Sequence, residues 1–354
     1  MAGQEIHSSH KAQREAKKMV DNARVIFTTC IGAGLGLLRD QYFEIVVIDE
    51  ASQQTEPASL VPITKGCLKA ILVGDHVQLR PTVQPHALAQ EFDVSLFERL
   101  YKQPDGGSDG AMVGLSRVML DTQYRMHRSI CEFPSEEFYD SNLKTGIQDD
   151  ERPMFPSGFP WPHLPHVGGP DLGHARMVFV ECSAREELGQ KSKSNKGQAA
   201  LCAHIVSLLH KDELKATPPP PPANTAATSA TSSDRPKPSI AVLTPYAQQF
   251  NLLKASLSAF SNVEACSIDG FQGKEADIVV FVTVRCNEHR EIGFLKDLRR
   301  MNVALTRAKT GLIVIGNAAT LTTGTSYPES TAMWKRLLAR LTKVPMNLED
   351  SSAT

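Results

Sequence analysis

Short runs of β-branched residues alternate with helical stretches along most of this 354-residue chain, and this alternation constrains the fold more than any other feature. Parallel strands need long crossover connections, usually helices, so the pattern predicts βαβ units and an α/β fold with mainly parallel sheets. The strands predicted in the first part are Arg24–Thr29, Glu44–Ile48 and Leu68–Val73. Those predicted later are Arg117–Leu120, Met177–Glu181, Ile240–Leu243, Val263–Ile268, Asp277–Val284 and Leu312–Ile315.

Helices are predicted between these strands. The ranges are Glu56–Ile63, Gly197–His210, Ala247–Ala259 and Asp297–Thr306. Pro57 lies near the first turn of the first range, where its missing N–H costs nothing. Apolar residues also recur at helical spacing and predict one further helix with a buried face. They are Leu88, Phe92, Leu96 and Leu100.

The length suggests two domains, and the polar, turn-rich segment Gln103–Gly110 is the predicted boundary. We expect an N-terminal helix or tail (1–20), a partial first domain (21–102), a linker (103–114), a complete second domain (115–341) and a C-terminal tail (342–354). The second part has six predicted strands and the first only three. Five consecutive prolines predict a low-complexity, disordered insertion at 216–239.

Composition excludes some classes of protein. The formal net charge is −1, so any nucleic-acid binding must come from a local groove. The apolar runs fall far short of the roughly 18 residues that span a membrane, and the first 20 residues lack a secretory apolar segment. Seven scattered cysteines without a C-x-x-C pair indicate reduced thiols. We therefore expect no membrane contact, a monomer, and a location in the cytoplasm or nucleus.

The apolar run Ile45–Ile48 ends in two carboxylates, Asp49 and Glu50. Such a run places acidic groups at the carboxyl edge of a parallel sheet, where ligands bind, as in a Walker B motif. Asp49 would then hold the shell of a Mg²⁺ ion, and Glu50 would polarise the attacking water. An ordinary strand end carries the same residues, so this pattern alone leaves both interpretations open.

Further runs follow in a fixed order. They are GDHVQLRP (74–81), LDTQYRMH (120–127), SIDGFQGKEAD (267–277) and MNVALTRAK (301–309). With Asp49-Glu50 they closely resemble motifs II to VI of superfamily 1 helicases of the up-frameshift type, and VIFTTCIGAG (25–34) resembles motif Ic of that group. The resemblance extends from about Asp21 to Ala339.

The resemblance implies a P-loop NTPase fold with two RecA-like domains, the first truncated here, which bind ATP and Mg²⁺ between them and single-stranded RNA or DNA across their top. It implies catalytic roles for Asp49, Glu50, Gln78, Arg125 and Arg307, with Gln78 and Arg125 at the γ-phosphate and Arg307 as arginine finger. It implies cofactor contacts for Tyr124, Gly273 and Glu275. It places Thr28, Thr29, Gly32, Ala33 and Pro81 at the nucleic acid.

The residue types support several of these roles independently. Arginine stays charged and offers a planar fork that suits phosphate oxygens, although Arg125 and Arg307 could each form ordinary surface salt bridges instead. Small residues at a strand end, as at Thr28, Thr29 and Gly32–Gly34, would let a nucleic-acid backbone approach exposed N–H groups. An ordinary glycine-rich turn is the competing interpretation.

Two glycine-rich runs are not nucleotide-binding loops. A G-x-G-x-x-G fingerprint would need glycine at Leu37, and a P-loop at 268–275 would need glycine at Ile268 and Ser or Thr at Glu275. No G-x-x-x-x-G-K-[ST] occurs in the 354 residues. We therefore expect the chain alone not to hydrolyse ATP efficiently, and the unpaired strands of its first domain to leave apolar faces uncovered. Part of a 5′-to-3′ helicase and a catalytically inert nucleic-acid- or protein-binding scaffold both stay open.

Overall fold

The computed structural model describes residues 2–103, 115–155, 157–164, 173–189, 192–211 and 237–346, with side chains from Lys11 onward. The chain divides into two compact units, Met1–Val118 and Met119–Thr354, and each is described here by itself. Among the described residues, no helix combines the length and apolar character needed to cross a membrane. The predicted insertion 216–239 and boundary Gln103–Gly110 lie almost entirely outside the described residues.

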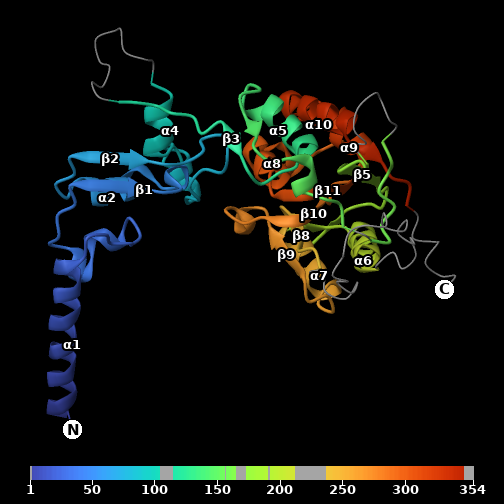
Figure 1. Cartoon of the computed structure of the whole chain (residues 1–354). Helices are drawn as coiled ribbons and strands as arrows, with labels where there is room; N and C mark the ends of the chain where they lie inside the picture. Colours follow the sequence, from blue (N-terminus) through green and yellow to red (C-terminus); the bar gives the residue numbers. More distant parts are fainter. Residues whose placement is uncertain are drawn as a thin grey trace, which may run out of the picture. The chain divides into compact units, whose positions relative to one another are not determined.

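The described residues of unit 1 contain one parallel strand pair. Strand β1 (Ile45–Ile48) pairs with β2 (Lys69–Leu72) in a register that runs from Ile45↔Lys69 to Ile48↔Leu72. The crossover helix α2 (Glu56–Ile63) has the predicted bounds and lies between the strands in sequence (Figure 1). A small core of Val46, Ile48 and Ala51 forms beneath it. Helix α1 (Ala2–Asn22) precedes this βαβ unit.

The prediction of a single helix through Leu88 and Leu100 is wrong. Two short helices, α3 (Pro85–Leu88) and α4 (Leu96–Tyr101), occupy that range, and Leu88 and Phe92 are exposed. The interruption has a backbone cause, because Glu91 has φ +59°, a left-handed conformation that ends a helix. Ser95 then starts α4 by accepting a hydrogen bond from the Glu98 N–H.

The predicted strand Arg24–Thr29 is also wrong. This segment has no strand partner within residues 2–103, and Phe27 is 95% exposed. A strand needs a neighbouring ladder for its backbone hydrogen bonds, and local sequence cannot supply one. The expected uncovered apolar face is confirmed, because Ile45 and Val47 of β1 are 67% and 62% exposed.

Unit 2 is built on a six-stranded, wholly parallel sheet with the order β12-β5-β11-β10-β8-β9. The strands are β5 (Met177–Glu181), β8 (Ile240–Thr244), β9 (Val263–Ser267), β10 (Ala276–Val282), β11 (Ala308–Gly316) and β12 (Thr342–Lys343). The central strands are buried on both faces, as parallel strands between two helical layers should be. The predicted α/β fold with mainly parallel sheets is confirmed.

Helices cover both faces of this sheet (Figure 1). On one face α6 (Lys196–His210) and α7 (Ala247–Ser256) pack on a core that includes Val242, Val280 and Ile205. On the other lie α5 (Arg128–Phe138), α8 (Leu298–Leu305) and α10 (Pro328–Arg340). There the Phe281 ring of β10 stacks on Trp334 of α10 at 6.3 Å.

Several elements of unit 2 differ from the prediction. Arg117–Leu120 is not a strand, and the following Thr122–Gln123 (β3) pairs instead with Lys144–Thr145 (β4). The helices α5, α9 (Ala318–Thr323) and α10 were not predicted, and α5 even contains Pro134. Strand β12 pairs with β5 and continues the sheet to Lys343, two residues beyond the predicted end of the second domain.

Candidate nucleotide and nucleic-acid site

The acidic pair predicted to bind the metal lies at the carboxyl end of β1. Asp49 Oδ1 accepts a hydrogen bond from the Glu50 N–H at 3.0 Å, and Gln53 Nε2 donates to Glu50 Oε2 at 2.5 Å. Glu50 has φ +51°, a left-handed conformation that is uncommon for a residue with a side chain. Both carboxylates are exposed at the sheet edge, as the sequence predicted.

These carboxylates suit Mg²⁺. Mg²⁺ is commonly held by one or two protein carboxylates, with water and substrate phosphates completing its octahedron. Asp49 and Glu50 offer hard oxygen ligands that face solvent. Within the described residues no group of three His, Cys, Asp or Glu side chains forms a closed metal cage, and this ion does not need one.

The loop after β2 lies at the same edge as the acidic pair. A Cβ on Gly74 would lie 2.8 Å from the Ser52 amide nitrogen, so glycine allows this loop to approach the turn after β1. Asp75 N–H donates to Ser52 Oγ at 3.2 Å, and Gln78 Nε2 donates to Asp75 Oδ2 at 2.8 Å. Asp49, Glu50 and Gln78 therefore lie in the loops that follow two neighbouring parallel strands, and the Asp75–Ser52 bond joins these loops.

Arg80, in the same loop, was given no role from sequence. Its guanidinium makes a bidentate pair with Glu98 at 2.8 and 2.6 Å and a third bond to Asp93 at 2.9 Å. Glu98 is 1% exposed and also accepts from Lys102. The pairing raises the pKa of Arg80 further above its ordinary value. Arg80 thus ties the Gln78 loop to α4, a contact across 18 positions for which the sequence offers no local signal.

The predicted nucleic-acid segment folds into a tight turn. The amides of Gly32 and Ala33 donate to Oγ1 and O of Thr29, each at 3.0 Å, so neither is an exposed donor. Ala33 is 1% exposed, and Pro81 is also buried. Thr28 and Thr29 are the exposed members of the predicted set. In this conformation Thr28 and Thr29 could contact a nucleic-acid backbone, whereas the amides of Gly32 and Ala33 could not.

In unit 2, Gln123 and Arg152 fix the turn that carries Tyr124 and Arg125. Gln123 Oε1 accepts from the amides of Arg125 and Met126 at 2.8 and 2.7 Å. Arg152 Nη2 and Nε donate to the carbonyls of Tyr124 and Arg125, each at 3.1 Å. Arg152, which directly precedes Pro153, is not among the predicted site residues. Only the tertiary fold brings Arg152 next to this turn.

The Tyr124 ring lies against Gly146, the residue after β4. A Cβ on Gly146 would lie 2.3 Å from Tyr124 Cε1, so only glycine fits beneath the ring in this position. Tyr124 is nevertheless 68% exposed. One part of the ring therefore rests on the backbone at Gly146 while much of it stays available for stacking.

Glu275 brings together three of the motifs. Arg125 Nε donates to Glu275 Oε2 and Lys309 Nζ to Glu275 Oε1, both at 2.8 Å. These two hydrogen bonds lower the pKa of Glu275 to about 2. Arg125 Nη1 also donates to the Thr306 carbonyl at 3.1 Å. Two cations thus share one carboxylate in a cluster that could exchange it for a phosphate.

Arg307, the predicted arginine finger, is 2% exposed. Its Nε donates to the Val303 carbonyl and its Nη2 to Thr306 Oγ1, both at 2.9 Å. It would have to change rotamer to reach a phosphate. Gly273 has φ +76° with open space around the position of a Cβ, so the turn needs glycine for its backbone conformation.

The structure brings the predicted residues together in two groups, one in each unit. Asp49, Glu50 and Gln78 form the first, and Arg125, Glu275 and the turn before Arg307 form the second. The prediction that both groups face one cleft stays a prediction.

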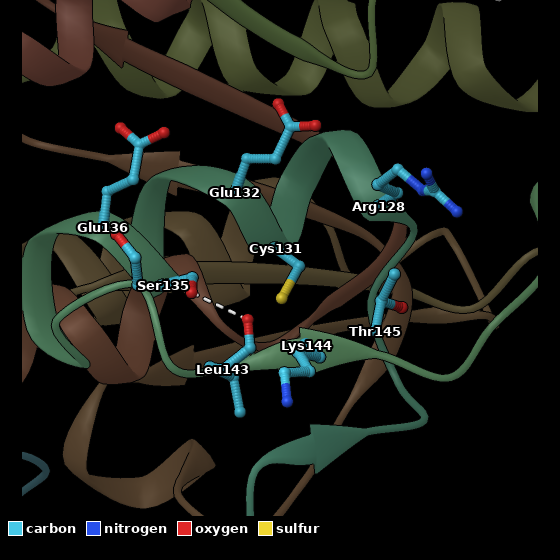
Figure 2. A pocket seen from close by; sticks show the side chains of 9 residues that line it. Arg128, Cys131, Glu132, Ser135, Glu136, Leu143, Lys144 and Thr145 are labelled. Atoms are coloured by element: carbon cyan, nitrogen blue, oxygen red, sulfur yellow. Dashed lines mark hydrogen bonds between the residues drawn. The ribbon is translucent and has the colours of Figure 1, made fainter.

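A cavity on unit 2 contains neither group. It has a volume of about 380 Å³ and lies between α5 and β4 (Figure 2). Cys131 and Ser135 turn toward Leu143, and Ser135 Oγ donates to the Leu143 carbonyl at 2.7 Å. Burial raises the pKa of Cys131 to about 11, so its thiol is not activated. The cavity is lined by side chains of both charges and by an unreactive thiol, so we assign it no catalytic or binding role.

Comparison with known proteins identifies the family. An AAA domain family matches residues 92–319 and a second AAA domain family matches residues 3–85. The "Regulator of nonsense transcripts 1 homolog" of Neurospora crassa is 35% identical over 88% of this chain and 26% of its own length. The "ATP-dependent helicase NAM7" of Saccharomyces cerevisiae is 35% identical over 91% of this chain and 29% of its own.

The "DNA polymerase alpha-associated DNA helicase A" of Schizosaccharomyces pombe is 34% identical over 90% of this chain and 46% of its own length. This chain thus spans about a quarter to about a half of these relatives. A solved PRRSV helicase structure matches 80% of this chain and 37% of its own at 14% identity and a TM-score of 0.36, too low to support an argument. Because one AAA domain family covers more than half of the chain, and the relatives align with about nine tenths of it, the chain belongs to the superfamily 1 helicases of the up-frameshift type.

Proposed function

We propose that this chain forms part of an ATP-dependent helicase that moves 5′ to 3′ on single-stranded RNA or DNA. The observation that carries the proposal is that Asp49-Glu50 and the Gln78 loop follow the neighbouring parallel strands β1 and β2 at one edge, where Asp75 of the loop bonds Ser52 of the turn after β1. Names of relatives include both a regulator of nonsense transcripts and a DNA helicase, so the proposal covers both nucleic acids.

The roles follow from the chemistry of each group. Bound Mg²⁺ would neutralise phosphate charge, with Asp49 in its shell. Glu50 carries a carboxylate one residue further along, in a position to polarise water. Gln78 can sense the γ-phosphate through its side-chain amide, which the Asp75 carboxylate orients.

The arginines of unit 2 would stabilise the transferred phosphate. Arg125 and Arg307 offer planar guanidinium groups that match phosphate oxygens. In the present conformation Arg125 pairs with Glu275, and Arg307 donates to carbonyl and hydroxyl oxygens of α8 and its end. We propose that nucleotide binding exchanges these internal partners for phosphate oxygens.

We further propose that the 354-residue chain by itself turns over ATP poorly. Its sequence contains no G-x-x-x-x-G-K-[ST] loop to cradle the β- and γ-phosphates. One preorganised donor in such a site is worth about 2.7–4 kcal/mol, and this loop supplies several. Binding of single strands does not need that loop and should persist.

Two measurements test the proposal. The chain alone should bind a single-stranded oligonucleotide with an affinity that falls as salt rises, but should show no ATPase above background. A variant extended at its N-terminus with a segment that carries a G-x-x-x-x-G-K-[ST] loop should gain nucleic-acid-stimulated ATPase and lose it on Glu50→Gln. Robust hydrolysis by the chain alone contradicts the low-turnover proposal. An extended variant that folds and binds ATP but does not hydrolyse it would favour the inert scaffold.

A further inference from the structure

Phe294 is an exposed aromatic side chain on a rigid turn of unit 2. The turn η7 (Gly293–Lys296) holds Phe294 52% exposed, while the next residue, Leu295, is fully buried. Gly293 has φ +55°, and a Cβ there would lie 2.1 Å from Arg285 Nη1. The backbone on both sides is therefore fixed by packing, and the Phe294 ring lies 5.2 Å from the buried Tyr246 ring while about half of its surface stays exposed.

A buried polar network supports this turn. Arg285 is 3% exposed and donates to Glu186 at 2.8 Å, and the Phe294 N–H donates to the Tyr246 hydroxyl at 3.3 Å. Tyr246 follows β8 and Arg285 follows β10, so the network lies past the carboxyl ends of two central strands. Ligands of open parallel sheets bind at this edge.

Cations accompany the aromatic rings at this position. The Arg300 guanidinium lies 5.8 Å from the Phe294 ring centroid and pairs with Asp269 through two bonds of 2.9 and 3.0 Å. Lys296, which ends the same turn, has its Nζ 4.2 Å from the ring centroid of Tyr327 and donates to the Tyr327 hydroxyl at 3.0 Å, a bond that a phosphate would have to replace. Asp269 belongs to the SIDGFQGKEAD run, so this cluster is continuous with a helicase motif.

We propose that Phe294 is a stacking platform for one base of a bound single strand, with Lys296 beside it to contact the backbone phosphate. Surfaces that bind single strands without sequence preference combine aromatic platforms with cations in this way. The proposal rests on the nucleic-acid binding proposed above and names a residue that none of the helicase-like runs contains. A solitary exposed apolar residue needs no function, but a rigid aromatic flanked by cations at a ligand-binding edge fits this ligand.

The test is the affinity of the full 354-residue chain for fluorescein-labelled oligothymidylate and oligouridylate of about 15 nucleotides, measured by anisotropy over a salt series. Phe294→Ala should weaken binding by about fivefold to about 150-fold, the usual value of one stacked base. The slope of log affinity against log salt should not change, because Phe294 contacts no phosphate. Lys296→Ala should instead reduce that slope by about 0.7.

Matched variants separate stacking from packing. Phe294→Tyr keeps a stacking ring and should bind like the original chain, whereas Phe294→Leu keeps an apolar side chain and should lose most of the affinity. Leu188→Ala removes another exposed apolar side chain of unit 2 and should have no effect. The platform is refuted if the original chain binds with a normal salt dependence and Phe294→Ala binds equally well. If the original chain binds neither oligonucleotide, the proposed function fails before the platform does.

Discussion

The buried pair of Arg80 and Glu98 should stabilise the Gln78 loop far more than a pair of the same geometry on the surface. Unit 1 offers both. Arg80 donates to Glu98 at 2.8 and 2.6 Å, and Arg99 donates to Glu56 twice at 2.7 Å. The Glu98 side chain is 2% exposed, whereas those of Arg99 and Glu56 are 47% and 30% exposed. The two pairs therefore differ in the burial of the carboxylate, and they also differ in partners, because Arg80, itself 31% exposed, bonds Asp93 as well.

The burial of each pair sets how much stability its loss should cost. Replacing Arg80 by Met keeps most of the aliphatic stem but leaves the Glu98 carboxylate buried, in an ion pair with Lys102. Removing one member of a buried pair typically costs about 3–5 kcal/mol, and the remaining lysine places this change near 3 kcal/mol. Arg99→Met breaks an exposed pair and should cost about 0.2–1 kcal/mol.

Hydrogen exchange of the amides in residues 75–102 measures this difference directly, because exchange reports the free energy of local opening. Exchange should accelerate about 150-fold in Arg80→Met and at most about fivefold in Arg99→Met. The double variant Arg80→Met with Glu98→Met should recover much of the protection, since an apolar replacement removes the buried unpaired charge. Equal acceleration in the two single variants would show that burial does not decide the strength of these pairs.

Three further changes have defined outcomes. Glu275→Gln should destabilise unit 2 at neutral pH, because folding lowers the pKa of the Glu275 carboxyl from an ordinary 4.5 to about 2. The difference in free energy of unfolding between the original chain and the variant should fade as pH falls from 4.5 toward 2. Urea unfolding at several pH values checks this, with Glu264→Gln, in the exposed pair with Lys274, as a control expected to change little. Gly146→Ala should displace the Tyr124 ring with little loss of stability. NMR spectra should then show a shift of the Tyr124 signals alone, whereas unchanged signals together with a large loss of stability would contradict the prediction. Gly273→Ala should lower the free energy of unfolding by about 1 kcal/mol through its left-handed backbone, and unaltered thermal unfolding would contradict that.

Sequence alone determined the elements whose signal is local. The apolar runs of β5, β8, β10 and β11 are buried on both faces of a parallel sheet, so each is readable as a short hydrophobic segment without knowledge of its neighbours. The same holds for the helix at Glu56–Ile63 and for the carboxylates that follow β1. Motif order then predicted the family, which the comparisons show.

Only the tertiary structure decided which residues pair. Phe27 lies in a run that resembles a strand, yet the segment has no ladder partner in the described residues, and a strand is defined by its partner. Glu275 joins Arg125 across 150 positions, and Arg152 donates to the Tyr124 carbonyl across 28. Such long-range bonds depend on how the chain packs in three dimensions, and local spacing carries no information about them.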